Sequence, residues 1–281
     1  TTLYGGGDEV EFPPEAVWDV ERLESTAAWL DSVLVSSEFR VLDAGCATGT
    51  FLGALKGLGW TCLVGLDPSP VATETATRIH GVETVTGSFL EPPADIGEFD
   101  VVALSHVLEH LVDVRGAVEG IRNLTRLGGF AYLEVPDASA YADHLVAPFH
   151  DFNTEHINHF SLPLLCRLME AFGFTEVESG AKVIQCSATH NYPAIFGLWQ
   201  RRSENPTPEV SVESDEELLV AIGRYVELSS ELLNRFDATL TAELEGQDDV
   251  VIWGAGQLAL KILSETVLAE KNVVAIIDGS P

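Results

Sequence analysis

The chain has 281 residues, 46% of them hydrophobic, and its 15 Lys and Arg against 44 Asp and Glu give a formal net charge of −29. This length suggests about two domains, and the acidic charge disfavours nucleic acid and anionic membrane surfaces as partners. The four cysteines form no C-x-x-C pair, which argues against a zinc ribbon or a disulfide framework and for a cytoplasmic location. No apolar run reaches the roughly 18 residues of a membrane-spanning helix.

Apolar spacing predicts a helix over residues 15–35, and strands and helices then alternate as far as residue 135. We expect strands at 40–42, 61–66, 82–86, 99–104 and 130–135, and helices at 50–58, 70–79 and 108–127. Gly128 and Gly129 would close the last helix. This alternation is typical of βαβ units and predicts an α/β fold with a Rossmann-like, doubly wound parallel sheet.

Beyond Pro136 the alternation gives way to a polar, histidine-rich connection. The later expected elements are a helix at 162–172, a closing hairpin of two strands within 174–187, a linker at 203–214, a long helix at 215–244, and a strand, helix and strand at 250–253, 257–268 and 273–277. The last three form a partial second Rossmann-like βαβ unit, which cannot bury its own faces. Either the protein continues past Pro281 or this unit packs on the first domain. The long helix has enough apolar surface to form a homo-oligomer or to pack within one chain.

The most informative segment is VLDAGCATGT, residues 41–50. Its strand ends at Asp43, at the edge where open α/β sheets bind ligands. Gly45 permits close approach of the backbone to a ligand, and Gly49 permits tight packing of strand against helix. Asp67 ends the next strand and is placed to accept two ribose hydroxyls. The turn reads G-x-x-x-G and lacks the G-x-G-x-x-G of dehydrogenases.

VLDAGCATGTFL resembles the first motif of class I S-adenosylmethionine-dependent methyltransferases. GLDPS, FDVVALSHVLEHLVD and GGFAYLEVPD match later motifs in the expected order, so the resemblance runs from Val41 to about Gly173. It implies S-adenosylmethionine as the cofactor, with Asp43 and Gly45 near its methionine part and Asp67 on its ribose. Ser88 stands where an Asp commonly contacts the adenine. The full set of expected cofactor-binding residues is Asp43, Gly45, Cys46, Gly49, Asp67, Pro68, Ser88, Phe89 and Ser105.

Two histidine-carboxylate clusters are candidates for the chemistry. SHVLEH, residues 105–110, follows the fourth strand on the cofactor side, so His106 can reach the substrate. Glu109 and His110 have the alternative role of capping the next helix. HDFNTEHINHFS, residues 150–161, lies in the connection where this fold places substrate-specific insertions. A histidine held by a carboxylate can remove a proton from a methyl acceptor near neutral pH.

EHINHFSLPLLCRLMEAFGF also resembles the segment after the fifth strand of sugar C-methyltransferases, which carry a Rossmann-like C-terminal domain. This resemblance implies a sugar or nucleotide-linked sugar as acceptor, with His156 as general base and Glu155 orienting it. His106 is a further candidate catalytic residue. Asn153 stands where that family has a tyrosine, and the family's N-terminal Cys cluster is absent.

Asn153, His110 and His159 are the expected substrate contacts in this region. Metal binding by the histidine-rich run is an alternative, but its spacing defines no geometry and we expect no metal. In a plainer interpretation, Ser161 caps the following helix while His159 and Phe160 pack against it.

WGAGQLA, residues 253–259, looks like a second ligand-binding turn, with Asp278 closing the next strand. Gly254 and Gly256 would contact a phosphate of the substrate. An architectural turn and an NAD-binding oxidoreductase are the alternatives here, as are O- or N-methylation of another metabolite and a non-catalytic module for the whole chain. We assign residues 1–36 to an arm and helix, 37–195 to a methyltransferase domain, 196–246 to a linker and long helix, and 247–281 to the start of a C-terminal Rossmann-like domain.

Overall fold

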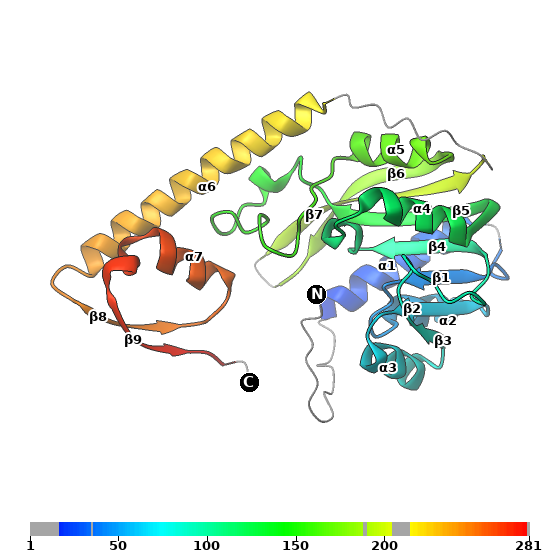
Figure 1. Ribbon diagram of the computed structural model, residues 1–281, viewed down its shortest axis with the longest axis horizontal. Helices are drawn as coiled ribbons and strands as arrows, with labels where there is room; N and C mark the ends of the chain where they lie inside the picture. The colour runs from blue at the N-terminus through cyan, green and yellow to red at the C-terminus, as the bar shows by residue number, and fades with distance from the viewer. Residues whose placement is uncertain (1–16, 35, 188–189, 204–213, 280–281) are drawn as a thin grey trace. The chain divides into compact units, whose positions relative to one another are not determined.

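The computed structural model describes residues 17–34, 36–187, 190–203 and 214–279. The chain falls into two compact units, residues 1–136 with 162–212 and residues 137–161 with 213–281 (Figure 1). Within the described residues, no helix has the length and apolarity needed to cross a membrane.

The first unit is built on a seven-stranded sheet of order β3-β2-β1-β4-β5-β7-β6 (Figure 1). Its strands are β1 (Val41–Ala44), β2 (Leu63–Asp67), β3 (Glu83–Thr86), β4 (Phe99–Ser105), β5 (Thr125–Pro136), β6 (Phe174–Gln185) and β7 (Asn191–Arg201). β1 to β5 pair in parallel, whereas β7 pairs antiparallel with both β5 and β6. The predicted Rossmann-like, doubly wound sheet is confirmed. Its strand order reverses between β1 and β4, where such sheets bind ligands.

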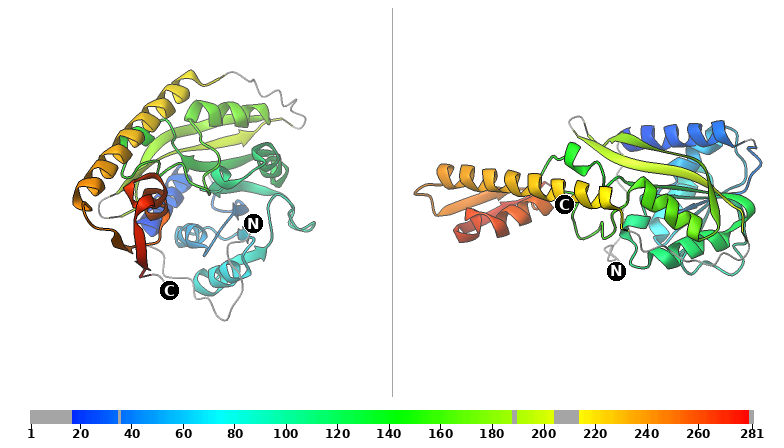
Figure 2. Two further views of the ribbon diagram at one scale, coloured as in Figure 1. Left: turned by 60° about the vertical axis from the view of Figure 1, so that its left-hand side comes forward. Right: turned by 90° about the horizontal axis from the view of Figure 1, so that it is seen from above.

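Helices cover both faces of this sheet: α1 lies on one face, with α4 and α5 on the other (Figure 2). They are α1 (Val17–Val33), α2 (Thr50–Gly57), α3 (Pro70–His80), the 3₁₀ turn η1 (Leu108–His110), α4 (Val114–Leu124) and α5 (Leu162–Ala171). Local sequence sets several ends. The Ser69 side chain accepts a hydrogen bond from Ala72 N–H ahead of Pro70 at the start of α3, and Asp113 caps α4 in the same way through Gly116 N–H.

Apolar side chains fill the space between α1, α2 and the sheet. Leu30 of α1, Leu52 and Leu55 of α2 and Val101 of β4 are all buried in one cluster. β1 is buried along its whole length, as a central parallel strand covered by helices on both faces must be. This core fixes the carboxyl ends of β1, β2 and β4 beside one another.

Two predicted boundaries were wrong. The helix expected over 108–127 is instead η1 followed by α4, which ends at Leu124, because β5 begins at the β-branched Thr125, paired with Phe99. Residues 174–187 do not form a hairpin by themselves: β6 is one long strand, and its partner is β7. The predicted domain boundary at residue 195 therefore falls inside β7.

The second unit contains the 3₁₀ turn η2 (Tyr141–Asp143), α6 (Glu216–Glu243), β8 (Asp249–Trp253), α7 (Gln257–Glu265), the 3₁₀ turn η3 (Val267–Glu270) and β9 (Asn272–Ile277). Tyr225 of α6 packs on Tyr141 and Phe152, with ring centroids 5.5 and 5.0 Å away. β8 and β9 pair in parallel, and Trp253 and Val274 stay exposed. The predicted long helix and partial βαβ unit are both present.

Leu52→Ala tests the packing of α2 on the sheet. Because Leu52 is fully buried, we expect its truncation to lower the free energy of unfolding by about 2–5 kcal/mol. Leu58→Ala, at the exposed carboxyl end of the same helix, is the matched control and should change stability by no more than about 0.5 kcal/mol. Urea unfolding measures both, and equal losses would contradict this core assignment.

Candidate functional site

The turn after β1 depends on two glycines with positive φ, Gly45 at +86° and Gly49 at +81°. A Cβ on Gly45 would lie 2.7 Å from Cγ2 of Val107, and one on Gly49 would lie 2.7 Å from Cβ of Ala76. Gly49 therefore serves tight packing against α3, as predicted. Because Gly45 has no Cβ, the segment after β4 can pack against it. The carboxyl ends of β1 and β4, between which the strand order reverses, therefore lie close together.

Asp67 at the end of β2 is held in place by backbone donors. Its Oδ2 accepts the N–H of Ala47 at 3.0 Å, and its Oδ1 accepts the N–H of Ser69 at 2.8 Å. A carboxylate offers about four lone-pair sites, so a fixed Asp67 can also accept the two hydroxyls of a ribose. This geometry fits the role that the sequence assigned to it.

Asp43 lies at the carboxyl end of β1 and is almost completely buried. Burial raises its pKa to about 7; Asp67 adds to the rise, and Arg22 opposes it. The neighbouring Cys46 is also buried, and burial, followed by Asp43 and Asp67, raises the pKa of its thiol well above the ordinary value. Asp43 and Asp67 thus place two carboxyl groups at this turn, which suits a ligand that carries an ammonium and a sulfonium charge.

The other predicted cofactor residues lie on the segments after β2 and β3. Pro68 is exposed, Phe89 is buried, and the Ser88 Oγ accepts the N–H of Leu90 at 3.2 Å. Ser88 also forms an isolated bridge with Glu91. Their contact with the cofactor stays a prediction.

His106 follows β4 with a φ of +53°, an unusual backbone conformation for a residue other than glycine. Its Nδ1 lies 3.2 Å from Oε1 of Glu109, and its Nε2 lies 3.1 Å from Oε1 of Glu134. Burial alone would lower the pKa of His106, but the hydrogen bonds to these carboxylates outweigh it and the pKa is raised. Both ring nitrogens thus face carboxylate oxygens, which favours the protonated form of His106 over the neutral form that a base needs.

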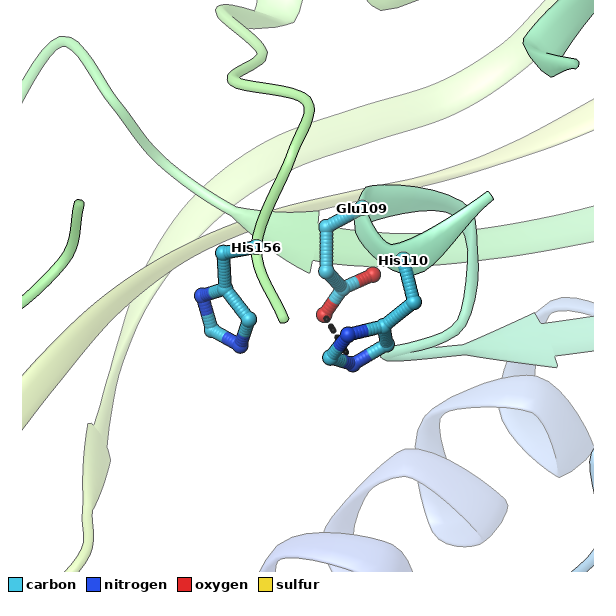
Figure 3. A group of neighbouring side chains, drawn as sticks. All are labelled: Glu109, His110 and His156. Carbon is cyan, nitrogen blue, oxygen red and sulfur yellow. Dashed lines mark ion pairs between the residues drawn. The ribbon is translucent and has the colours of Figure 1, made fainter. Parts of the chain in front are cut away.

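Glu109 lies in η1 and is fully buried, and its Oε1 is also 3.9 Å from Nε2 of His110 (Figure 3). The alternative that Glu109 or His110 caps the next helix is wrong, because Asp113 caps α4. Figure 3 also draws His156, which belongs to the second unit.

The most densely bonded side chain of this edge is Glu134 on β5, which is fully buried. Its Oε1 accepts from Arg22 Nη1 at 2.9 Å and lies by His106, while its Oε2 accepts from the Tyr132 hydroxyl and from Lys182 Nζ, both at 2.5 Å. Burial alone would raise the pKa of Glu134, but His106, Lys182 and Arg22 hold it far below its ordinary value. Glu134 is therefore ionised and compensated by charges from three different elements.

Helix α1 contributes to this network through residues spaced along one face. Arg22 also donates to the Ser105 Oγ at 3.0 Å, and Thr26 Oγ1 lies 3.1 Å from Lys182 Nζ. One turn further, the Trp29 ring packs on Tyr132 with a centroid distance of 5.8 Å. Ser105 is thus tied to Arg22 within the network.

The connection after β5 belongs to the second unit. Asn153 Oδ1 accepts the N–H groups of both Glu155 and His156 at 2.8 Å, so this predicted substrate contact shapes the loop that carries the predicted base. Glu155 is exposed and His156 is half-buried. The His159 ring lies tilted against Phe152 with centroids 4.7 Å apart, and burial lowers its pKa. This partner belongs to the connection itself, whereas the plainer interpretation expects His159 to pack against the helix after Ser161.

The second glycine turn repeats the hydrogen bonds of the first. Gly254 N–H donates to the carbonyl of Ile277 at 2.7 Å, as Gly45 N–H does to Leu66 at 2.7 Å. Asp278 Oδ2 accepts the N–H of Ala255 at 2.6 Å, as Asp67 does that of Ala47. Phosphate contact at Gly254 and Gly256, like the expectation of no metal, stays a prediction.

Sequence reasoning missed Glu134, Arg22 and Lys182. One signal was available: Glu134 is a charged residue inside the otherwise apolar strand FAYLEVP. Arg22 and Lys182 carried none, because both are distant from β5 in the sequence.

A family model described as a methyltransferase domain matches residues 20–179, more than half of the chain. The chain belongs to this methyltransferase family. The predicted cofactor, S-adenosylmethionine, is therefore confirmed, and the fixed Asp67 and the turn around Asp43 fit its ribose and its positive charges.

Relatives of this methyltransferase include proteins named ubiquinone biosynthesis O-methyltransferase. The one from Thiobacillus denitrificans is 31% identical over 119 residues, covering 40% of this chain and 50% of the relative. The one from Paraburkholderia phymatum is 32% identical over 111 residues, covering 37% and 47%. The chain spans about half the length of these curated relatives.

Solved structures support the fold. A SAM-dependent methyltransferase from Thermotoga maritima has a TM-score of 0.50 and 19% identity, covering 66% of this chain and 92% of its own. Magnesium protoporphyrin IX methyltransferase from Synechocystis with bound SAH has a TM-score of 0.51 and 16% identity, covering 66% and 84%.

Asp43→Asn tests the electrostatics of the glycine turn. Because the pKa of Asp43 is raised to about 7, the folded protein holds this proton more tightly than the unfolded chain. The wild type therefore loses stability as the pH rises from the ordinary carboxyl range to about 7. The amide variant lacks this loss. Its free energy of unfolding relative to wild type should increase between about pH 5 and pH 7, by at most about 1.4 kcal/mol per pH unit. Urea unfolding across this range measures it, and a constant difference would contradict the raised pKa.

Proposed function

We propose that this methyltransferase transfers the methyl group to a hydroxyl oxygen of a small molecule, with His156 as the general base. The choice of His156 over His106 rests on one observation. The two ring nitrogens of His106 lie 3.2 Å from Glu109 Oε1 and 3.1 Å from Glu134 Oε1. Because both nitrogens face carboxylates and the pKa of His106 is raised, His106 is poorly suited to take a proton from the acceptor. Of the catalytic histidines expected from the sequence, His156 is then the remaining one.

The names of the relatives support oxygen as the methylated atom, since several are O-methyltransferases. Displacement at the sulfonium-bound methyl group needs an aligned nucleophile and, for a hydroxyl, removal of its proton. The Asn153 hydrogen bonds to the N–H groups of Glu155 and His156 support this role, because they order the backbone that presents the imidazole.

A sugar-linked acceptor methylated on carbon is the second candidate. The observation that favours it is the Glu155-His156 pair and the Phe160-Ser161 sequence ahead of α5, which resemble sugar C-methyltransferases. In that reaction His156 would remove a proton from the carbon beside a keto group, with Glu155 as its partner.

Transfer of a ¹³C-labelled methyl group distinguishes the candidates. The protein is incubated with methyl-labelled S-adenosylmethionine and two acceptor sets, catechols and nucleotide-linked sugars, and the products are examined by NMR. We expect a label on oxygen, whose methyl carbon resonates far downfield of one bound to carbon. A product labelled on carbon contradicts O-methylation and supports the sugar C-methyltransferase candidate.

His156→Gln tests the base with the acceptor found in that assay. We expect kcat to fall by about 10²–10⁴-fold, the usual contribution of a general base, while the affinity for S-adenosylhomocysteine, measured by calorimetry, stays within about twofold. His150→Gln, an exposed histidine in the same connection, is the matched control and should keep its turnover. Equal turnover of His156→Gln and wild type would exclude His156 as the base.

A further inference from the structure

Glu134 gathers more positive charge than a single buried carboxylate requires. A buried carboxylate needs a paired charge and further hydrogen bonds, and Glu134 has three cations, Arg22, Lys182 and His106, within 3.1 Å of its oxygens. Only 15 of the 281 residues are Lys or Arg. Two of these 15 residues and one histidine contact a single carboxylate. This density of positive charge is unusual for so acidic a chain.

The side chains of the three cationic residues retain some solvent exposure, whereas those of the carboxylates do not. The side chains of Arg22, His106 and Lys182 are 16%, 23% and 26% exposed, while Glu134 and Glu109 are 0% exposed. The accessible polar atoms of these three side chains are N–H donors. Their surface offers hydrogen-bond donors and therefore suits a negatively charged group that accepts hydrogen bonds.

The charges around this surface nearly balance, but the two carboxylates that face the cations are buried. Three cations face two buried carboxylates, Glu134 and Glu109. Asp43 is close enough for Arg22 to lower its pKa, but burial holds that pKa near neutrality, which reduces its negative charge. Asp19 lies one turn before Arg22 on α1, and these two residues act in opposite directions on Cys186. Asp19 thus adds one carboxyl group to the surroundings of Arg22.

The location ties the cluster to methyl transfer. Arg22 donates to Ser105, at the carboxyl end of β4, and it influences Asp43 at the end of β1. These are the two strands between which the order of the sheet reverses, and the ligand crevice of such a fold lies there. A group bound by Arg22 and Lys182 is thus adjacent to the cofactor crevice.

We propose that Arg22 and Lys182, with the positive charge of His106 beside them, form a binding site for an anionic group of the methyl acceptor, a carboxylate or a phosphate, and that Glu134 is the positioning residue that aims them. The inference rests on the proposed function only in taking the ligand to be the acceptor. Arg22 offers a planar fork of donors and Lys182 a point charge, a combination suited to an oxyanion with two or more oxygens. Glu134 fixes all three heads before the ligand arrives, which reduces the entropy lost on binding.

Anion titration tests this site without turnover. The protein, saturated with S-adenosylhomocysteine, is titrated with sulfate in one arm and acetate in the other, each against chloride at equal ionic strength. The readout is the imidazole NMR signal of His106, assigned with His106→Gln. We expect a saturable shift: sulfate as the stronger ligand indicates a phosphate on the acceptor, and acetate a carboxylate. Absence of a saturable shift with both anions overturns the proposal.

Lys182→Gln supplies the specific variant, because Arg22, His106 and Tyr132 still compensate Glu134. The loss of one charge-assisted hydrogen bond, about 1.5–3 kcal/mol, predicts a fall in anion affinity of about tenfold or more. Lys56→Gln makes the same charge change elsewhere in this unit, where Lys56 donates to the carbonyls of His80 and Gly81, and should leave the affinity unchanged. Equal effects of the two variants would mean a nonspecific field and overturn the site.

Glu134→Gln separates positioning from binding. It removes the buried charge but keeps one acceptor oxygen, and S-adenosylhomocysteine affinity and thermal unfolding report whether the variant is folded. We expect weaker sulfate binding together with a His106 signal whose titration midpoint moves to lower pH, a change that a merely structural residue would not cause. If Glu134→Gln fails to fold, Lys182→Gln still decides the proposal. If the protein methylates only uncharged acceptors, the anion site is contradicted but O-methylation is not. If the product is labelled on carbon and sulfate still binds, only the proposed function is contradicted.

Discussion

A carboxylate removed from water must be surrounded by donors and positive charge, and Glu134 imposes this condition on the first unit. Its partners come from α1, from the turn after β4, from β5 itself and from β6. An uncompensated ion at this position would cost several kcal/mol. One side chain therefore links three parts of the first unit: helix α1, the turn with His106 and the hairpin of β6 and β7. The positions of these parts at this edge of the sheet depend on one another.

The register of the hairpin makes this arrangement geometrically feasible. Glu134 pairs with Phe196 on β7, which pairs with Gly180 on β6, and Lys182 follows on the same face. Lys182 must reach across an entire strand, and its ammonium passes 5.4 Å from the Phe196 ring centre. A Cβ on Gly180 would lie 3.3 Å from that ring. The glycine gives the phenylalanine room, and the phenylalanine in turn provides a cation–π surface for the lysine.

Periodicity and turn motifs predicted the parallel half of the sheet because its central strands, β1 and β4, are short and mostly apolar and alternate with helices. The same rules failed for β7, where Pro193 interrupts the strand pattern and the pairing partners are distant in sequence. At the site, Asp43, Gly49 and Asp67 were accessible to prediction, since their roles follow from a local turn. The protonation state of His106 could not be predicted, because its charge depends on Glu134, which is 28 residues away. The role of Glu134 depends in turn on α1 and β6.

The raised pKa of Cys46 has a chemical consequence for an enzyme of this kind. S-adenosylmethionine is an alkylating agent, and the thiolate is the strongly nucleophilic form of cysteine. Burial and the neighbouring carboxylates Asp43 and Asp67 keep this thiol protonated. The same surroundings therefore keep Cys46 in its weakly nucleophilic form.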